Sequence, residues 1–318
     1  MTSVASETTA YRTLREACGV LDCSERGKLA LSGPDAKPFL QGQVTNDVEA
    51  LSEGEGCYAA FLTPKGKMLG DMRILDASGE LLLDTERVAL QELFNMIRRH
   101  KVGYRVELHK RTLERGLLCL IGPASDEVAG TGDLPTVEHS HAPLEIAGVA
   151  ARAIRTEAGV DLLCDAADIG ALLGVVEARG AVQVPESAVD VLRVERGSPR
   201  YGIDLDETVI PQEAGLNRRA VSFTKGCYVG QETVARLHYR GKPNRNLRGL
   251  ALSAAADRGA ELRMGERSVG TLTTVASSPA FGSIGLALVR REAPPGTTVS
   301  VLGDGGVTAE VVELPFEN

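Results

Sequence analysis

Aromatic side chains are scarce in this chain of 318 residues: tryptophan is absent and all aromatics together make up 4%. The cores must therefore consist mainly of Leu, Val, Ile and Ala, and the 43% hydrophobic content excludes an overall disordered chain. No apolar run approaches the roughly 20 residues that a membrane-spanning helix needs. Residues 1–10 lack the apolar centre of a signal peptide. We therefore expect a cytoplasmic protein that makes no membrane contact.

Closely paired cysteines are also missing. The six cysteines are Cys18, Cys23, Cys57, Cys119, Cys164 and Cys227. Their wide spacing does not support a disulfide framework or a zinc site, both of which need closer pairs. His139 and His141 lie in a polar stretch, where we expect exposure to solvent and not metal binding. The sequence thus predicts reduced thiols and no metal site.

The pattern of secondary structure changes near Gly249. Before it, short strands predicted at 28–32, 57–63, 67–75 and 80–84 form an antiparallel meander, and helices are predicted at 87–100, 166–179 and 185–197. Residues 131–143 read as a loop. After it, five short segments rich in Val, Leu and Thr predict a small β-barrel or sandwich. The chain is therefore α+β, with a region 1–248 of two intertwined subdomains and a C-terminal β-barrel at 249–318.

One segment is basic although the chain as a whole carries a net charge of −8. Residues 217–248 hold eight Arg and Lys side chains against one acid, Glu232. Such an island favours an anion site, and one alternative is nucleic-acid binding through it. The overall negative charge and the scarcity of aromatic rings for base stacking argue against that alternative.

Within the island, residues 225–232 read K-G-C-Y-V-G-Q-E. The two glycines indicate a sharp backbone turn, and a helix is predicted from Gln231 to Leu237. Cys227 would then lie just before a helix N-terminus and beside a cation, which favours its thiolate. The alternative, that Cys227 is a small buried hydrophobe, is equally consistent with the residues alone.

This eight-residue stretch resembles the signature of YgfZ-type folate-binding proteins, which are related to the T-protein (aminomethyltransferase) of the glycine cleavage system. Segments that also fit are 40–47, 61–67, 193–197, 211–216, 235–236 and 239–242. The resemblance covers most of the chain, with 107–181 the least diagnostic part. It implies folate-binding α+β domains around a central cavity, followed by a C-terminal β-barrel.

The resemblance also implies a function. YgfZ-type proteins bind tetrahydrofolate or a one-carbon derivative and support the assembly or repair of iron–sulfur client proteins, a role in which Cys227 is expected to be essential. The alternative is a folate-dependent aminomethyl or one-carbon transferase that uses Asp71 as its base. T-proteins carry two adjacent acids where this chain has Gly70 and Asp71, and this departure favours the accessory role.

The resemblance places further residues in the folate site. Glu195 matches the glutamate that holds the pterin, and a carboxylate can accept two parallel hydrogen bonds from an aminopyrimidine edge. Its alternative is a surface residue beside Arg193 and Arg196. The other residues expected to line the cavity or bind the anionic glutamate tail of the folate are Lys225, Tyr228, Arg236 and Tyr239.

Overall fold

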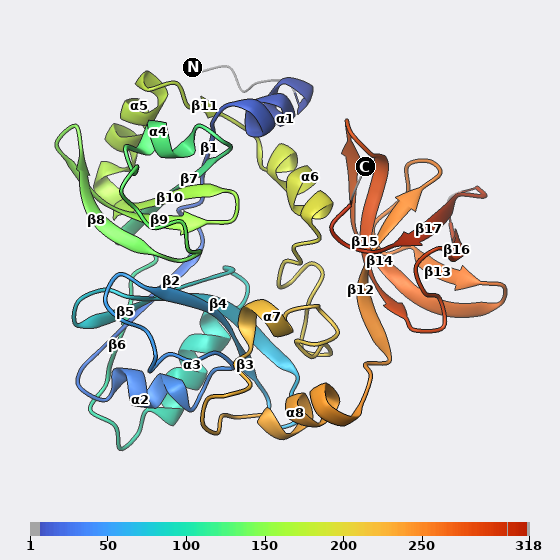
Figure 1. The fold of residues 1–318 in the computed structure, drawn as a ribbon, viewed down its shortest axis with the longest axis horizontal. Helices are drawn as coiled ribbons and strands as arrows, with labels where there is room; N and C mark the ends of the chain where they lie inside the picture. Colours follow the sequence, from blue (N-terminus) through green and yellow to red (C-terminus); the bar gives the residue numbers. More distant parts are fainter. Residues whose placement is uncertain (1–6, 304, 317–318) are drawn as a thin grey trace. The chain divides into compact units, whose positions relative to one another are not determined.

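The structure, a computed structural model, describes residues 7–303 and 305–316 and divides into two compact units (Figure 1). Unit 1 contains the chain up to Leu62, then Leu69–Ala188 and Arg219–Val229. Unit 2 contains Thr63–Met68, Val189–Arg218 and the chain from Gly230 onward. The chain thus crosses between the units several times. The domain boundary near Gly249 stays a prediction.

Unit 1 contains a five-stranded sheet in the order β3-β4-β5-β2-β6. Its strands are β2 (Gly27–Ser32), β3 (Gly56–Leu62), β4 (Met68–Asp76), β5 (Glu80–Thr85) and β6 (Glu107–Lys110). The meander predicted from the sequence is confirmed for β3, β4 and β5, with β4 and β5 antiparallel across a turn at Ser78 and Gly79. It is wrong for β2, which lies beside β5 and not beside β3. Helix α3 (Leu90–His100) buries Leu93 and Ile97 as its apolar spacing predicts, and α2 (Ala36–Gln41) is short.

A second sheet of unit 1 has six strands in the order β11-β1-β7-β10-β9-β8. They are β1 (Gly19–Asp22), β7 (Arg115–Ile121), β8 (His141–Ile146), β9 (Val149–Thr156), β10 (Gly159–Asp165) and β11 (Val182–Gln183). Helices α1 (Glu7–Glu16), α4 (Ser125–Ala129) and α5 (Ile169–Ala178) accompany it, with a 3-10 turn at Ala166–Asp168. The core here is aliphatic, including Leu118, Leu120, Leu162, Leu172 and Val176, which agrees with the low aromatic content.

The loop predicted at 131–143 is wrong at its end, because β8 begins at His141. This strand is at the edge of the sheet, and within the described residues it pairs with β9 alone. Pro143 has no backbone N–H to donate, and an edge strand tolerates this because one of its sides has no neighbouring strand. An edge strand can also carry polar side chains. The usual strand signals are therefore weak in its sequence.

Unit 2 includes a closed six-stranded barrel in the order β12-β15-β14-β13-β16-β17, which confirms the predicted C-terminal barrel (orange to red in Figure 1). Its strands are β12 (Arg245–Leu252), β13 (Glu261–Met264), β14 (Arg267–Ser278), β15 (Gly282–Arg290), β16 (Thr298–Val301) and β17 (Thr308–Val312). The remaining helices are α6 (Glu186–Arg196), α7 (Asn217–Ala220) and α8 (Gln231–Arg240). The four-residue β13 was missed because it is short and half polar.

Among residues 7–303 and 305–316, none of the helices combines the length and the apolar character that a bilayer crossing requires.

Candidate functional site

Asp71 on β4 carries a buried carboxyl group in unit 1. Its side chain is 6% exposed, and the Tyr58 hydroxyl on the neighbouring strand β3 donates a 2.6 Å hydrogen bond to its Oδ2. Burial raises the pKa of Asp71 to about 6, while the Tyr58 hydrogen bond and the charge of Arg26 act in the opposite direction. A group with this pKa can take up and release a proton near neutral pH.

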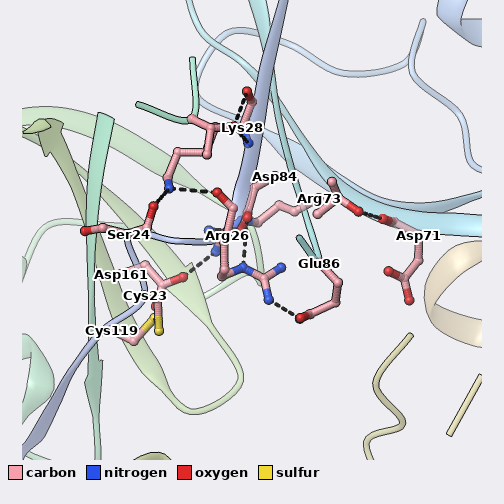
Figure 2. A network of polar contacts seen from close by, with 12 residues as sticks. Cys23, Ser24, Arg26, Lys28, Asp71, Arg73, Asp84, Glu86, Cys119 and Asp161 are labelled. Carbon is pink, nitrogen blue, oxygen red and sulfur yellow. Dashed lines mark hydrogen bonds and ion pairs between the residues drawn. The ribbon is translucent and has the colours of Figure 1, made fainter. Parts of the chain in front are cut away.

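Charged residues form a network next to Asp71 (Figure 2). Arg26 donates to Glu86 and, at 2.9 Å, to Asp84. The Arg73 guanidinium forms ion pairs with the carboxylates of Asp84, at 2.8 Å, and Asp161, at 2.7 Å. Among these groups, the Glu86 charge raises the pKa of Asp71 and the Arg26 charge lowers it, so Arg26 sets part of the proton affinity at the candidate site.

Sequence reasoning missed Tyr58. Its ring lies under Arg219, whose guanidinium carbon is 5.7 Å from the ring centroid and whose Nη2 is 2.6 Å from Glu138. Nothing in the local sequence marks Tyr58, because its partner Asp71 is 13 residues away and is reached only through strand pairing. The sequence held one signal for this pair, because Tyr58 and Asp71 are polar residues on two mainly apolar strands that are predicted to be neighbours.

The conspicuous motif around Cys227 is held by Lys225, which is 8% exposed. The Lys225 Nζ donates to the carbonyl oxygens of Gln41, Val44 and Asn46 at 2.6, 2.8 and 2.7 Å. All three of its hydrogens are therefore used, and the ammonium joins two motifs, 40–47 and 225–232, that lie far apart in the sequence. Tyr228 is buried beside it, with the Lys225 Nζ 5.2 Å from the ring centroid.

Cys227 itself is exposed, so the alternative of a small buried hydrophobe is wrong. The predicted turn is present at Gly230, which has φ 83° and caps the N-terminus of α8. The helix predicted at 231–237 continues to Arg240. Cys227 therefore lies in an exposed loop that enters a helix, which leaves its sulfur accessible to other molecules.

The carboxylate of Glu195 in unit 2 is buried, with 4% of the residue exposed. Its Oε1 accepts a 2.6 Å hydrogen bond from the Ser278 hydroxyl at the end of β14, and its backbone oxygen accepts one from the amide of Phe316. Arg193 pairs instead with Asp204 at 2.6 Å. The alternative of a surface glutamate is therefore wrong. Removing a carboxylate from water is costly and needs a compensating partner.

Two further polar side chains of unit 2 have buried oxygens. The side-chain oxygens of Gln212 and Asn217 are buried, and within 7–303 and 305–316 neither has a hydrogen-bond partner. Both are acceptors, as is the Glu195 carboxylate.

Arg236 and Tyr239 lie on α8 and are exposed, Tyr239 to 67%. Thus Asp71, Lys225, Cys227 and Tyr228 belong to unit 1, whereas Glu195, Arg236 and Tyr239 belong to unit 2.

Ion pairs and burial engage four of the eight cations of the basic island. Arg219 pairs with Glu138, Arg245 with Glu213 at 3.1 Å and Arg248 with Glu313 at 3.0 Å, while Lys225 is buried. Charges committed to protein partners contribute little to a phosphate-binding surface. Arg218, Arg236, Arg240 and Lys242 are exposed, so the nucleic-acid alternative now rests on four cations instead of eight and stays a prediction.

The expectation that His139 and His141 face solvent is wrong. His141 is buried at the start of β8, and its Nε2 lies 3.2 Å from the Glu55 backbone oxygen. Burial lowers the pKa of His139 to about 3 and that of His141 to about 4, so both are neutral at pH 7. Among the described parts of the chain, no group of three or more His, Cys, Asp or Glu is arranged to hold a metal ion.

Comparison with known proteins agrees with this architecture. The family model of the GCVT N-terminal domain matches residues 2–225, and that of the glycine cleavage T-protein C-terminal barrel domain matches residues 245–317. The crystal structure of glycine cleavage system aminomethyltransferase T from Bartonella henselae superimposes with a TM-score of 0.87 at 23% identity. It covers 100% of this chain and 91% of that one, and shows the same fold.

Curated relatives extend the similarity to the sequence. An aminomethyltransferase from Rubrobacter xylanophilus is 31% identical over 96% of this chain and 85% of its own length. A putative chloroplastic transferase from Arabidopsis thaliana is 29% identical over 93% of this chain and 71% of its own. An aminomethyltransferase from Thermotoga maritima is 31% identical over 95% and 87%. The chain therefore belongs to the glycine cleavage T-protein family and is homologous to the aminomethyltransferases.

Proposed function

We propose that this protein binds tetrahydrofolate and transfers a one-carbon unit, of the aminomethyl type, to or from it. Proteins of the family to which the chain belongs bind tetrahydrofolate. The relatives named aminomethyltransferase support this reading over the accessory role expected from the sequence motif. The single observation that carries the proposal is the buried Asp71 carboxyl group with its raised pKa.

Asp71 supplies the proton chemistry in this proposal. Bound tetrahydrofolate would supply a secondary amine that carries the one-carbon unit. The Tyr58 hydroxyl fixes Oδ2 of Asp71 at 2.6 Å, so proton exchange takes place on Oδ1. A pKa of about 6 leaves most of the carboxyl groups ionised at pH 7.5, ready to accept a proton, and it makes the protonated form accessible for the return step.

Glu195 is proposed to hold the pterin. A reduced pterin presents a row of N–H donors along its aminopyrimidine edge, and a carboxylate is the matching acceptor. The Ser278 hydrogen bond fixes the orientation of the buried carboxylate. The buried oxygens of Gln212 and Asn217 in the same unit add acceptors of the kind that such a ligand needs.

The remaining predicted residues receive different roles. Lys225 has no hydrogen left for a ligand, so we propose that it is a positioning residue that holds the 225–229 loop. Tyr228 shares that buried environment. Arg236 and Tyr239 are exposed on α8, where a cation and a ring can meet the anionic glutamate tail of a folate.

The test is an anaerobic assay of one-carbon transfer with tetrahydrofolate as acceptor and an aminomethyl donor. Asp71→Asn should lower the turnover number by at least about 100-fold, the usual contribution of an acid–base group. Cys227→Ser should leave turnover near the wild-type value. Full activity in Asp71→Asn, with folding verified, would refute the role of Asp71.

The exposed Cys227 favours a second candidate function, the support of iron–sulfur proteins by a YgfZ-type member of the family. A single thiol cannot hold a cluster that takes four protein ligands, but an exposed one can exchange with a client. Complementation of a strain that lacks the corresponding gene separates the two functions. If Cys227→Ser abolishes iron–sulfur enzyme activity in cells and Asp71→Asn does not, the accessory role is the principal one.

A further inference from the structure

Two cysteines of unit 1 that play no part in the proposed function lie against each other. The Sγ atoms of Cys23 and Cys119 are 2.9 Å apart, with Cys119 donating its hydrogen to Cys23 (Figure 2). Cys119 lies on β7, and Cys23 follows the last residue of β1. The antiparallel pairing of β1 with β7 aligns Leu21 with Cys119, and the Cys23 amide donates to the Leu117 oxygen. The two cysteines are therefore diagonal neighbours on one face of the ladder.

We propose that Cys23 and Cys119 are a redox site that forms a reversible disulfide with a low-molecular-weight disulfide as oxidant. Both residues are partly exposed, and only Cys23 has to meet the oxidant. The other thiols differ in position: Cys18, Cys57 and Cys164 are buried, and Cys227 lies in its exposed loop. Of the six cysteines, all within the described residues, Cys23 and Cys119 are the pair whose sulfur atoms are in contact.

The contact assigns different roles to the two sulfurs. The hydrogen bond that Cys119 donates to Cys23, together with burial and the nearby Asp161, raises the pKa of Cys119 well above its ordinary value. In this proposal Cys119 therefore keeps its proton, and Cys23 is the sulfur that attacks the oxidant. The Lys28 ammonium, which donates to the Ser24 backbone oxygen at 2.8 Å, interacts favourably with a negative charge on either sulfur. Cys23 is thus the attacking thiolate and Cys119 the resolving thiol.

The reaction balances without a metal. The Cys23 thiolate attacks one sulfur of the oxidant, the sulfur–sulfur bond of the oxidant breaks, and one small thiolate leaves. Cys119 then transfers its proton to solvent and attacks the Sγ of Cys23, which expels the second small thiolate. The protein has lost two electrons and two protons, and the oxidant has become two thiols.

The strand register indicates that the bond would be easily reduced. Diagonal neighbours of an antiparallel pair have Cα atoms about 7–8 Å apart, near the limit beyond which a disulfide needs backbone movement. Cys23 can move because it lies beyond the end of β1. Its backbone oxygen accepts from the Arg26 amide, so oxidation would displace the turn that carries Arg26. A strained, accessible disulfide is of the labile kind.

The test exposes the folded, full-length protein to oxidised glutathione, quenches it with acid, alkylates the remaining thiols and identifies linked peptides by mass spectrometry. We expect a Cys23–Cys119 link that reduced glutathione reverses. The link should also form in Cys227→Ser. Cys119→Ser should leave glutathione bound to Cys23, whereas Cys23→Ser should leave Cys119 unmodified.

Glutathione bound to the exposed Cys227 shows that the oxidant acts in every sample that keeps this cysteine. If Cys227 is modified while Cys23 and Cys119 stay reduced, the proposal is wrong. It is also wrong if the link forms only after urea is added, since the folded structure would then not direct it. Neither result depends on folate, so the proposed function stands or falls separately.

Discussion

Asp71 combines burial with a negative charge at neutral pH, a combination that costs stability. Its pKa is raised from 3.8 to about 6, mainly by burial. Between these values the native state binds a proton more tightly than the unfolded state, so this residue lowers the free energy of unfolding as the pH rises through the window. A residue kept at such a cost is expected to serve function more than folding.

The first prediction is that Asp71→Asn stabilises the protein at pH 7.5. Asparagine keeps an acceptor for the Tyr58 hydroxyl and carries no charge. The free energy of unfolding should exceed that of the wild type by on the order of 1–3 kcal/mol at pH 7.5, and the gap should shrink towards pH 4. Urea unfolding at several pH values measures it. A gap that does not change with pH would contradict the raised pKa.

Tyr58 influences the pKa of the Asp71 carboxyl group through its hydrogen bond. Because its hydrogen bond lowers the pKa of Asp71, Tyr58→Phe should raise that pKa further. The acid limb of the pH–turnover profile should therefore move to higher pH. The matched control is Tyr104→Phe, which removes the hydroxyl of an exposed tyrosine and should leave the profile in place. An unshifted limb in Tyr58→Phe would show that Asp71 does not produce it.

At the scale of elements, Lys225 connects two segments that no regular secondary structure joins. Lys225→Met removes three hydrogen bonds from a charged donor and leaves three carbonyl oxygens without it. The free energy of unfolding should fall by about 2–4 kcal/mol. Lys242→Met, at an exposed position of the same basic segment, should change it by less than about 0.5 kcal/mol. Equal changes in the free energy of unfolding of the two variants would contradict the positioning role of Lys225.

Packing between α3 and β4 explains why an acid does not precede Asp71. A Cβ atom at Gly70 would lie 2.9 Å from Leu93 Cδ1 and 3.1 Å from Ala89 Cβ, and Leu93 is fully buried. Gly70→Ala should therefore lower the free energy of unfolding by about 1–3 kcal/mol.

The control for that packing argument is Gly174→Ala on α5, where a Cβ would meet no atom within 4 Å. This variant should gain up to about 1 kcal/mol from better helix propensity. Thermal unfolding of both variants measures the contrast. A neutral Gly70→Ala would mean that α3 can move away from β4, and that the missing acid has another cause.

At the scale of the whole molecule, sequence patterns predicted the elements with strong periodicity or turn signals. Strands β2 and β5, helix α3 and the C-terminal barrel are confirmed within a few residues. Strand β8 was missed because an edge strand needs only one partner and can be polar. The Tyr58–Asp71 hydrogen bond and the Cys23–Cys119 contact were missed because strand register, which the residues do not state locally, creates them.

The central claim is that the protein binds tetrahydrofolate through Glu195, and anaerobic calorimetry tests it most directly, because the chain has no tryptophan to report binding by fluorescence. Glu195→Gln keeps an acceptor for Ser278 and loses the carboxylate, and exposed Glu266→Gln in the same unit is the control. We predict saturable binding to the wild type and to Glu266→Gln, weakened at least about 10-fold in Glu195→Gln. Equal affinity in all three would contradict the assignment of Glu195, and no binding to the folded wild type would contradict the account as a whole.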